Sequence, residues 1–337
     1  MQRTTRHRRS RGIFTAGLVA ASLALAACGG DDEEEPAGGG GSAGGGEQEE
    51  YDMTLIAGVK GDEFYITMNC GAQEKAKELG VNLDFQGPDK FDASLQTPIV
   101  NAVAAKQPDA VLIAPTDTKA MFAPIQQLAS GGSKIVLVDT TLEQPDMAES
   151  QIASDNEAGG REAASTLAEL MGGSGKAFVV NVKPGISTTD ARAKGFEEGA
   201  KEAGLEYLGQ DFSQDEPARA ASIIKAQLAK NPDIKGVFAT NLFSAEGTAN
   251  GVREAGKAGD VKIVGFDAGP AQVEQLEKGD VQALIAQKPA DIGAQGVEQA
   301  VKALNGEETT PKIGTDSVSI TKDNLEENQD ALYKSSC

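Results

Sequence analysis

The sequence has a single histidine, His7, and it lies in an N-terminal segment that we expect the mature protein to lose. Residues 1–27 contain five arginines, no acidic residue and a final apolar run, a composition typical of a secretory signal. Without His7 the chain has no imidazole for a Ser-His or Cys-His pair or for a zinc site. This absence excludes most hydrolytic chemistry. We therefore expect a protein that is not an enzyme and that uses no metal and no cofactor.

Basic residues are also scarce. The 337 residues include 51 acidic and 31 basic side chains, which gives a formal net charge of −20. Five of the basic residues lie in residues 1–27, so the rest of the chain has 26 basic against 51 acidic residues, a net charge of −25. A surface this acidic repels phosphate backbones, and we expect no nucleic acid partner.

A long hydrophobic run is missing as well. The apolar run at residues 17–27 is about half of the roughly 20 residues that a membrane span requires, so it predicts a signal and not a span. Leu25-Ala26-Ala27-Cys28 resembles the lipobox of bacterial lipoproteins, in which the cysteine becomes the lipidated N-terminus. The alternative is an ordinary signal peptide with a chance cysteine. Residues 31–50 are mostly Gly, Ser, Ala and acidic residues, so we expect residues 28–50 to be a lipidated cysteine and a flexible tether.

Beyond residue 50, apolar strand-like runs alternate with helical patterns along the whole chain. The predicted strands are residues 53–59, 81–85, 110–113, 135–138, 151–153, 177–181, 206–212, 236–239, 263–266, 283–285 and 317–320. The predicted helices are residues 66–79, 93–106, 118–130, 157–171, 189–203, 218–230, 245–255, 271–278 and 291–304, with Thr189 as the start signal of the fifth. Strict alternation builds parallel sheets that helices cover on both faces, and eleven strands in one sheet would be unusual. We therefore expect an α/β fold with two doubly wound parallel-sheet lobes.

The loop after the first predicted strand carries candidate ligand-binding residues. It holds Lys60, Asp62, Phe64 and Tyr65, which offer a charge, a hydrogen-bond acceptor and two adjacent rings. Open α/β folds bind their ligands at the carboxyl ends of their strands. Ring faces and carboxylates together suit a sugar-like molecule better than an anion. The alternative is that Phe64 and Tyr65 are core residues at a helix start.

Four other predicted strands stop on an acid or an amide. These residues are Asp139, Asn241, Asp267 and Gln287. A polar side chain in this position points into the crevice above the sheet, where it loses water unless something bonds to it. Together they would make a rim of acceptors suited to a polyhydroxylated ligand. Taken singly, each is also explained as a helix cap.

Several stretches together resemble the ribose- and galactose-type periplasmic binding proteins, which are the substrate-binding components of bacterial ABC importers for sugars. The stretches are Val138-Asp139, Ile152-Ala-Ser-Asp155-Asn156 with Gly159-Gly160, Ala191-Arg192-Ala-Lys-Gly195-Phe196, Val264-Gly-Phe-Asp267 and Ile285-Ala-Gln287-Lys-Pro289. The resemblance implies the type I periplasmic binding protein fold, with two lobes joined by a three-strand hinge. We expect an N-terminal lobe of residues 51–153 plus 288–316, and a C-terminal lobe and tail of residues 154–287 plus 317–337.

The resemblance also implies roles for individual residues. Phe64 and Tyr65 match the paired aromatic residues that pack against the sugar ring, and Arg192 matches an arginine that forks onto ring or hydroxyl oxygens. The other polar contacts that it implies are Asp62, Asp139, Asn241, Asp267 and Gln287. Three departures bear on the choice of sugar: Thr140 stands where the ribose type has a second arginine, Leu242 where an acid is common, and Asp215 near an opposing aromatic residue. We include Lys60, Thr140 and Asp215 among the predicted ligand-binding residues.

Two cysteines remain after Cys28, namely Cys70 and Cys337. Thiols outside the cell oxidise, so we expect a disulfide that ties the tail to the first lobe. The alternative is one buried cysteine and one free terminal thiol.

The functional prediction is a monomeric, extracytoplasmic binding lipoprotein that delivers a monosaccharide or similar polyol to an ABC permease. It would be anchored by a lipid at the outer face of the membrane, or periplasmic. One alternative is a sensor component that presents its ligand to a kinase or chemoreceptor. A secreted glycosidase with two carboxylates is another, but no acid pair is identifiable. The effector domain of a repressor is a third, and it lacks support because an export signal stands in place of a helix-turn-helix.

Overall fold

The structure is a computed structural model that describes residues 51–337. The signal predicted at residues 1–27, the lipidation site at Cys28 and the tether at residues 28–50 lie outside the described residues. Within the described range, no helix has both the length and the apolar character needed to cross a membrane.

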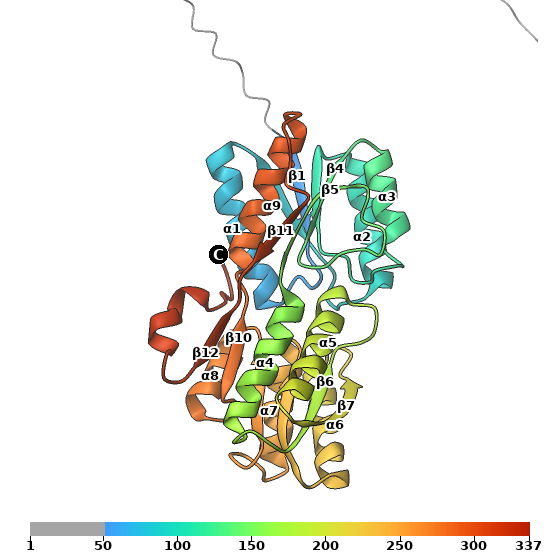
Figure 1. Cartoon of the computed structure of the whole chain (residues 1–337). Helices are drawn as coiled ribbons and strands as arrows, with labels where there is room; N and C mark the ends of the chain where they lie inside the picture. The colour runs from blue at the N-terminus through green and yellow to red at the C-terminus, as the bar shows by residue number, and fades with distance from the viewer. Residues whose placement is uncertain (1–50) are drawn as a thin grey trace, which may run out of the picture. The chain divides into compact units, whose positions relative to one another are not determined.

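The first lobe is built on a six-stranded sheet with the order β11-β5-β4-β3-β1-β2. Its strands are β1 (Asp52–Ile56), β2 (Asn82–Gln86), β3 (Ala110–Ile113), β4 (Lys134–Val138), β5 (Ala148–Ser154) and β11 (Lys312–Thr315). All of their pairings are parallel. Helices α1 (Glu63–Leu79) and α9 (Pro289–Leu304) pack on one face, and α2 (Ala93–Lys106) and α3 (Phe122–Ser130) on the other (Figure 1). Because both faces are covered, all four residues of β3 are buried.

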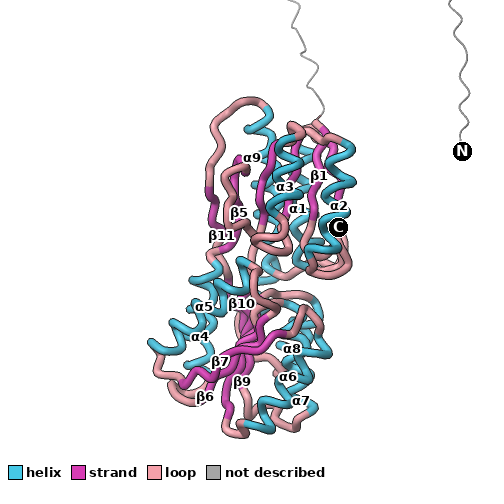
Figure 2. Tube along the Cα trace, turned by 90° about the vertical axis from the view of Figure 1, so that its right-hand side faces the viewer, coloured by secondary structure: helices cyan, strands magenta, loops and turns pink. Residues whose placement is uncertain are grey.

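The second lobe repeats this architecture with the strand order β12-β10-β9-β8-β6-β7. Its strands are β6 (Lys176–Asn181), β7 (Glu206–Phe212), β8 (Ile234–Ala239), β9 (Lys262–Phe266), β10 (Ala283–Ala286) and β12 (Val318–Thr321). Helices α4 (Asn156–Leu170) and α5 (Ser187–Glu202) lie on one face, and α6 (Pro217–Lys230), α7 (Leu242–Glu254) and α8 (Pro270–Lys278) on the other (Figure 2). The edge strand β12 runs antiparallel to β10, whereas the other pairings are parallel.

The chain passes between the two sheets three times. The passages run from β5 to α4, from β10 to α9 and from β11 to β12. Both lobes belong to one unit of the chain. The predicted fold class, two doubly wound α/β lobes joined by a three-strand hinge, is confirmed, and the antiparallel β12 is the one departure from the expected parallel pairing in the described residues.

The largest differences from the predicted elements lie at helix starts and near the C-terminus. Helix α1 begins at Glu63 and not at residue 66, because Asp62 caps it by accepting a hydrogen bond from the Phe64 amide. Helix α3 begins four residues later than predicted, because Asp117 holds the preceding residues in a turn. Strand β11 and the 3₁₀ helix η1 (Leu325–Ala331) have no strong sequence signal, since both are short and largely exposed.

Candidate ligand-binding site

A cavity lies between the lobes, and both lobes supply its walls. The first lobe contributes Asp62, Phe64, Tyr65, Phe91 and Asp139. The second lobe and the hinge contribute Val182, Ile186, Thr188, Thr189, Arg192, Asp215, Asn241, Asp267 and Gln287. About 40 Å³ is open to the centre of a water molecule. One buried water needs roughly 10–15 Å³ of such space, so the cavity suits one small molecule and not a polymer.

The fold explains why polar groups gather here. Asp139 follows β4 and Asp267 follows β9, so each stands at the carboxyl end of a parallel strand. Asp139 has a φ of 61°, Asp267 of 78° and Asp215 of 63°. This left-handed region is unfavourable for residues other than glycine, and retained backbone strain of this kind clusters at functional sites. The backbone geometry therefore singles out three of the cavity's carboxyl groups.

The carboxylate of Asp267 is held by three donors. Its Oδ1 accepts from Gln287 Nε2 at 2.7 Å and from the Tyr333 hydroxyl at 3.0 Å, and its Oδ2 accepts from the Leu242 amide at 3.0 Å. A carboxylate has roughly four acceptor sites, so this arrangement leaves one for a ligand. The group is thus fixed in position before any ligand arrives.

The guanidinium of Arg192 is also fixed. Its Nε donates to Asn156 Oδ1 at 2.7 Å, its Nη1 donates to the Thr240 carbonyl at 2.9 Å, and it stacks 3.8 Å above the Phe266 ring. Helices α4 and α5 touch backbone to backbone, because a Cβ at Gly160 would lie 2.1 Å from the Arg192 carbonyl oxygen. The side chain is 3% exposed, and no acceptor among residues 51–337 bonds Nη2. Arg192 therefore presents free donors to the cavity from a rigid support.

Burial dominates the electrostatics of the remaining acids. It raises the pKa of Asp139 to about 6, against the opposing effects of the Arg192 charge and the hydrogen bond that Tyr65 donates to Oδ2 at 2.7 Å. Burial likewise raises the pKa of Asp215 to about 6, although Asn241 donates to its Oδ1 at 2.7 Å. The pKa of Asp62 rises well above its ordinary value, first through burial and then through the charges of Asp267 and Asp215. The cavity is therefore unfavourable for anions and offers acceptors to hydroxyl groups.

The raised pKa of Asp139 predicts a stabilising substitution. Between about pH 4 and 6 the folded protein binds this proton before the unfolded chain does, so stability falls as the pH rises through that window and stays lower above it. The difference between 3.8 and about 6 corresponds to about 3 kcal/mol. We expect Asp139→Asn to raise the unfolding free energy of the unliganded protein at pH 7.5 by up to this amount, which applies in full to the closed conformation that buries the carboxyl group, and by little at pH 4.

Urea denaturation of the unliganded protein at several pH values measures this effect. Asp260→Asn is a suitable control because Asp260 is exposed. A gain for Asp139→Asn that is the same at pH 4 and pH 7.5 would show that burial of the charge is not its cause.

The structure separates the predicted ligand-binding residues into two groups. Those that line the cavity are Asp62, Phe64, Tyr65, Asp139, Arg192, Asp215, Asn241, Asp267 and Gln287. Lys60 and Thr140 are absent from the lining of this cavity, so their role as ligand contacts stays a prediction. The Lys60 amide donates to the Pro88 carbonyl at 2.9 Å, and the Lys60 side chain is exposed. The Thr140 hydroxyl donates inward to the Pro115 carbonyl at 2.8 Å.

Several residues that the sequence explained either as helix caps and core residues or as ligand-binding residues occupy both positions in the structure. Asp62 caps α1 and lines the cavity, and Asn241 caps α7 by accepting from the Ser244 amide while it also lines the cavity. Phe64 and Tyr65 are buried in the first turn of α1 and still border the cavity. Capping and core packing therefore hold these side chains in the orientation that a binding site needs.

Sequence reasoning missed Phe91, Thr188, Thr189 and the tail residue Tyr333 at this site. Thr189 lines the cavity, and its hydroxyl is buried without a hydrogen-bond partner in the described part of the chain. Its sequence position suggested only a helix start, and α5 in fact begins at Ser187. Tyr333 lies 66 residues from Asp267, and no local pattern connects the two.

Direct contacts close the two lobes over the cavity. Lys90 Nζ pairs with Glu216 Oε1 at 2.9 Å, and Lys183 Nζ donates to the Phe91 carbonyl at 2.7 Å. The Thr118 amide donates to the Gly185 carbonyl at 3.1 Å. Each of these contacts joins the first lobe to the second, so the structure is a closed conformation.

Comparisons with known proteins agree with this arrangement. The sequence profile of a family described as periplasmic binding protein domain matches residues 53–308. The ribose import binding protein of Salmonella typhimurium is 30% identical over 274 residues, which cover 80% of this chain and 90% of that protein. An ABC transporter solute-binding protein of Agrobacterium vitis, bound with alpha-D-tagatopyranose, is 41% identical with a TM-score of 0.83, and the match covers 85% of this chain and 100% of the other. A carbohydrate transporter solute-binding protein of Agrobacterium radiobacter, in complex with D-arabinose, is 27% identical with a TM-score of 0.80 over 85% of this chain and 100% of the other.

Proposed function

From the premise that the chain belongs to the periplasmic binding protein family, we propose that it is the substrate-binding lipoprotein of an ABC importer and binds a monosaccharide or similar polyol. The observation that supports this most is the cavity, whose walls come from both lobes and combine ring faces with fixed acceptors and one guanidinium. Relatives named for ribose and D-allose, and solved structures with bound monosaccharides, support the same class of ligand.

Each part of a sugar finds a suitable group in the cavity. The Phe64 ring, set edge-on to Tyr65 with centroids 5.0 Å apart, offers an apolar surface to the C–H face of a sugar ring. Asp139 and Asp267 accept from hydroxyl groups, and Arg192 donates to hydroxyl or ring oxygens. Since the acids outnumber the single arginine in the lining, an uncharged ligand fits better than a sugar acid.

Binding by closure follows from the division of these groups between the lobes. A sugar that touches Phe64 and Asp139 on one lobe and Arg192 and Asp267 on the other gains its full set of contacts only when the lobes are closed. It therefore shifts the population toward the closed state by its extra contacts there. The permease would recognise that state, and lipidation of Cys28 followed by the tether would hold the protein beside it.

A thermal-shift screen of the mature protein against monosaccharides, polyols and small amines tests the proposed function. A ligand that binds the folded protein stabilises it by mass action and so raises the melting temperature. At a ligand concentration of 100 times the Kd, the stabilisation is about 2.7 kcal/mol. We expect a shift with at least one neutral monosaccharide and none with sugar acids. If no sugar or polyol shifts the melting temperature or gives heat on titration, the proposal is wrong.

The partnerless Thr189 hydroxyl provides a residue-level prediction. Thr189→Val removes the hydroxyl and keeps the shape of the side chain, so it should weaken sugar binding about tenfold, or about 1.4 kcal/mol. The unliganded protein should keep its stability, because the hydroxyl has no partner to lose among residues 51–337. Thr248→Val is a matched control, since the Thr248 hydroxyl is also buried and unpaired but lies outside the cavity lining. Equal affinities for the two variants in calorimetric titration would remove Thr189 from the site.

A further inference from the structure

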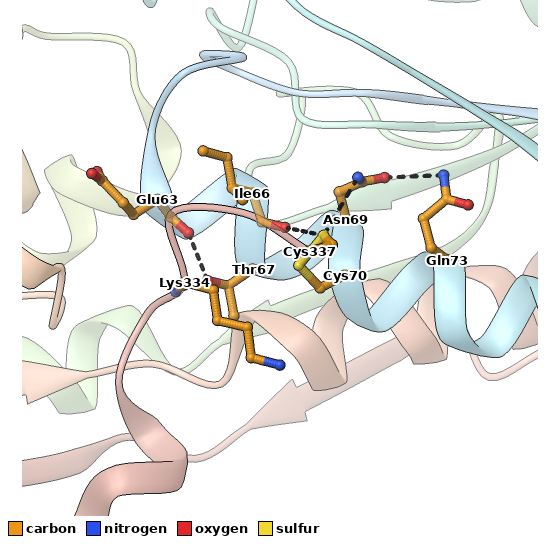
Figure 3. Close-up of a disulfide and its surroundings, with 8 residues drawn as sticks. All are labelled: Glu63, Ile66, Thr67, Asn69, Cys70, Gln73, Lys334 and Cys337. Atoms are coloured by element: carbon orange, nitrogen blue, oxygen red, sulfur yellow. Dashed lines mark hydrogen bonds between the residues drawn. A yellow bond between two sulfur atoms is a disulfide. The ribbon is translucent and has the colours of Figure 1, made fainter.

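The C-terminal tail of this chain returns from the second lobe to the first. After η1, the Tyr333 amide donates to the Ala268 carbonyl of the second lobe at 3.0 Å. One residue later, the Lys334 amide donates to Thr67 Oγ1 on α1 at 2.7 Å. The tail ends in a disulfide between Cys337 and Cys70, whose Cα atoms lie 5.3 Å apart (Figure 3). The last residues therefore join α1 of the first lobe to the loop that follows β9.

Tyr333 brings the tail into contact with the site, although it does not line the cavity. Its hydroxyl donates to Asp267 Oδ1 at 3.0 Å and accepts from the Gln287 amide at 3.0 Å. Its ring meets Phe64 edge-on, with centroids 5.8 Å apart. The side chain is 5% exposed. One phenol thus contacts a residue from each lobe and one from the hinge, and all three of those residues line the cavity.

Little besides the disulfide holds the tail against α1. Residues 334–337 are exposed, and the bond from the Lys334 amide to Thr67 is the backbone hydrogen bond that ties them to the first lobe. An exposed chain end with so few contacts frays readily. If the tail detached from the first lobe, the Tyr333 ring could move away from Phe64, and the Tyr333 hydroxyl could move away from Asp267.

We propose that Tyr333 is a positioning residue of the ligand site and that the Cys70–Cys337 disulfide keeps it there, so that the tail fixes Asp267 and Phe64 for ligand binding. This inference rests on the proposed function. Its physical basis is that the hydroxyl occupies one acceptor site of the Asp267 carboxylate and so holds the other oxygen sites toward the cavity. Tyr333 would act on the sugar through Asp267 and Phe64 without touching it.

A double-variant cycle tests this inference, with D-tagatose and D-ribose as probes in calorimetric titration. We expect Tyr333→Phe, which keeps the ring and loses the hydroxyl, to weaken binding about tenfold. Cys70→Ala combined with Cys337→Ala should weaken it about as much. All three substitutions together should cost clearly less than the product of the two losses, because both act through the same contact. Tyr51→Phe is the matched control, since it loses a hydroxyl bond to Asn305, and neither residue lines the cavity.

Hydrogen exchange at the Gln287 amide gives a second readout that needs no sugar. In the unliganded protein this amide donates to the Tyr333 hydroxyl, so we expect its exchange to be at least tenfold faster in Tyr333→Phe and in the double cysteine variant. An unchanged exchange rate would overturn the inference even if neither probe binds. A double cysteine variant that melts earlier but binds as tightly as the wild type would also overturn it. Failure of the wild type to bind any sugar counts against the proposed function instead.

Discussion

Arg192→Lys is expected to weaken sugar binding about 100-fold, or about 2.8 kcal/mol. Lysine keeps the positive charge but loses the planar fork that bonds Asn156 and Thr240 while it presents further donors to the cavity. Hydrogen bonds that involve a charged group contribute about 1.5–3 kcal/mol each, so the loss of one or two to the ligand accounts for the effect. The stack on the Phe266 ring is lost as well.

If Arg192 served the ligand alone, its substitution would leave the stability of the unliganded protein almost unchanged. The structure gives it a second role. Because the guanidinium also satisfies two buried acceptors, we expect the unliganded variant to lose about 1–3 kcal/mol of unfolding free energy.

Calorimetric titration with the sugar identified in the screen gives the affinity, and urea denaturation gives the stability. Arg161→Lys is the matched control on neighbouring α4, because Arg161 forms ion pairs with Glu157 and Glu198 outside the cavity lining. An Arg192→Lys protein that binds within threefold of the wild type would exclude Arg192 from the ligand contacts.

Asp267→Asn is expected to weaken binding by 100-fold or more and also to destabilise the protein. Both carboxylate oxygens accept hydrogen bonds, from Gln287, Tyr333 and Leu242. In asparagine, an NH₂ group replaces one of the two accepting oxygens. That NH₂ group would face a donor of the protein, and neither donor would have an acceptor. A buried unsatisfied group costs about 1–3 kcal/mol, so the unliganded protein should lose roughly 2–4 kcal/mol when one or two are left.

The same two measurements apply to Asp267→Asn. Asp233→Asn is the control, because the exposed Asp233 pairs with Lys176 in the same lobe, and surface pairs contribute about 0–1 kcal/mol. If Asp267→Asn lowers stability but binds the sugar as the wild type does, Asp267 has a structural role alone.

The fold was predictable from the sequence because its signal is local and repeated. Buried parallel strands such as β3 are short, continuous apolar runs, and some of the helices between them, such as α2 after Asp92, begin at a capping residue. Strand β11 escaped detection because it is a half-exposed four-residue edge strand, and its identity as a strand depends on pairing with β5.

The site residues differ in whether a local sequence pattern can identify them. A polar residue after a buried strand, such as Asp139 or Asp267, reaches the cavity because the sheet brings strand ends together. Lys60 and Thr140 lie close to such positions, but the Lys60 side chain is exposed and the Thr140 hydroxyl donates to the Pro115 carbonyl, so neither lines this cavity. Tyr333 depends on a contact across 66 residues and on the path of a tail without periodicity, so nothing in its neighbourhood marks it.

The tail also sets a limit on how widely the two lobes can part. Only three residues separate Tyr333, whose amide is bonded to Ala268 of the second lobe, from Cys337, which is covalently joined to α1 of the first. Fully stretched, four residue steps span at most roughly 13–14 Å. The tail therefore forms a short connection between the two lobes, in addition to the three hinge strands. Separation of the lobes at this edge would therefore require either the Tyr333–Ala268 hydrogen bond or the disulfide to break first.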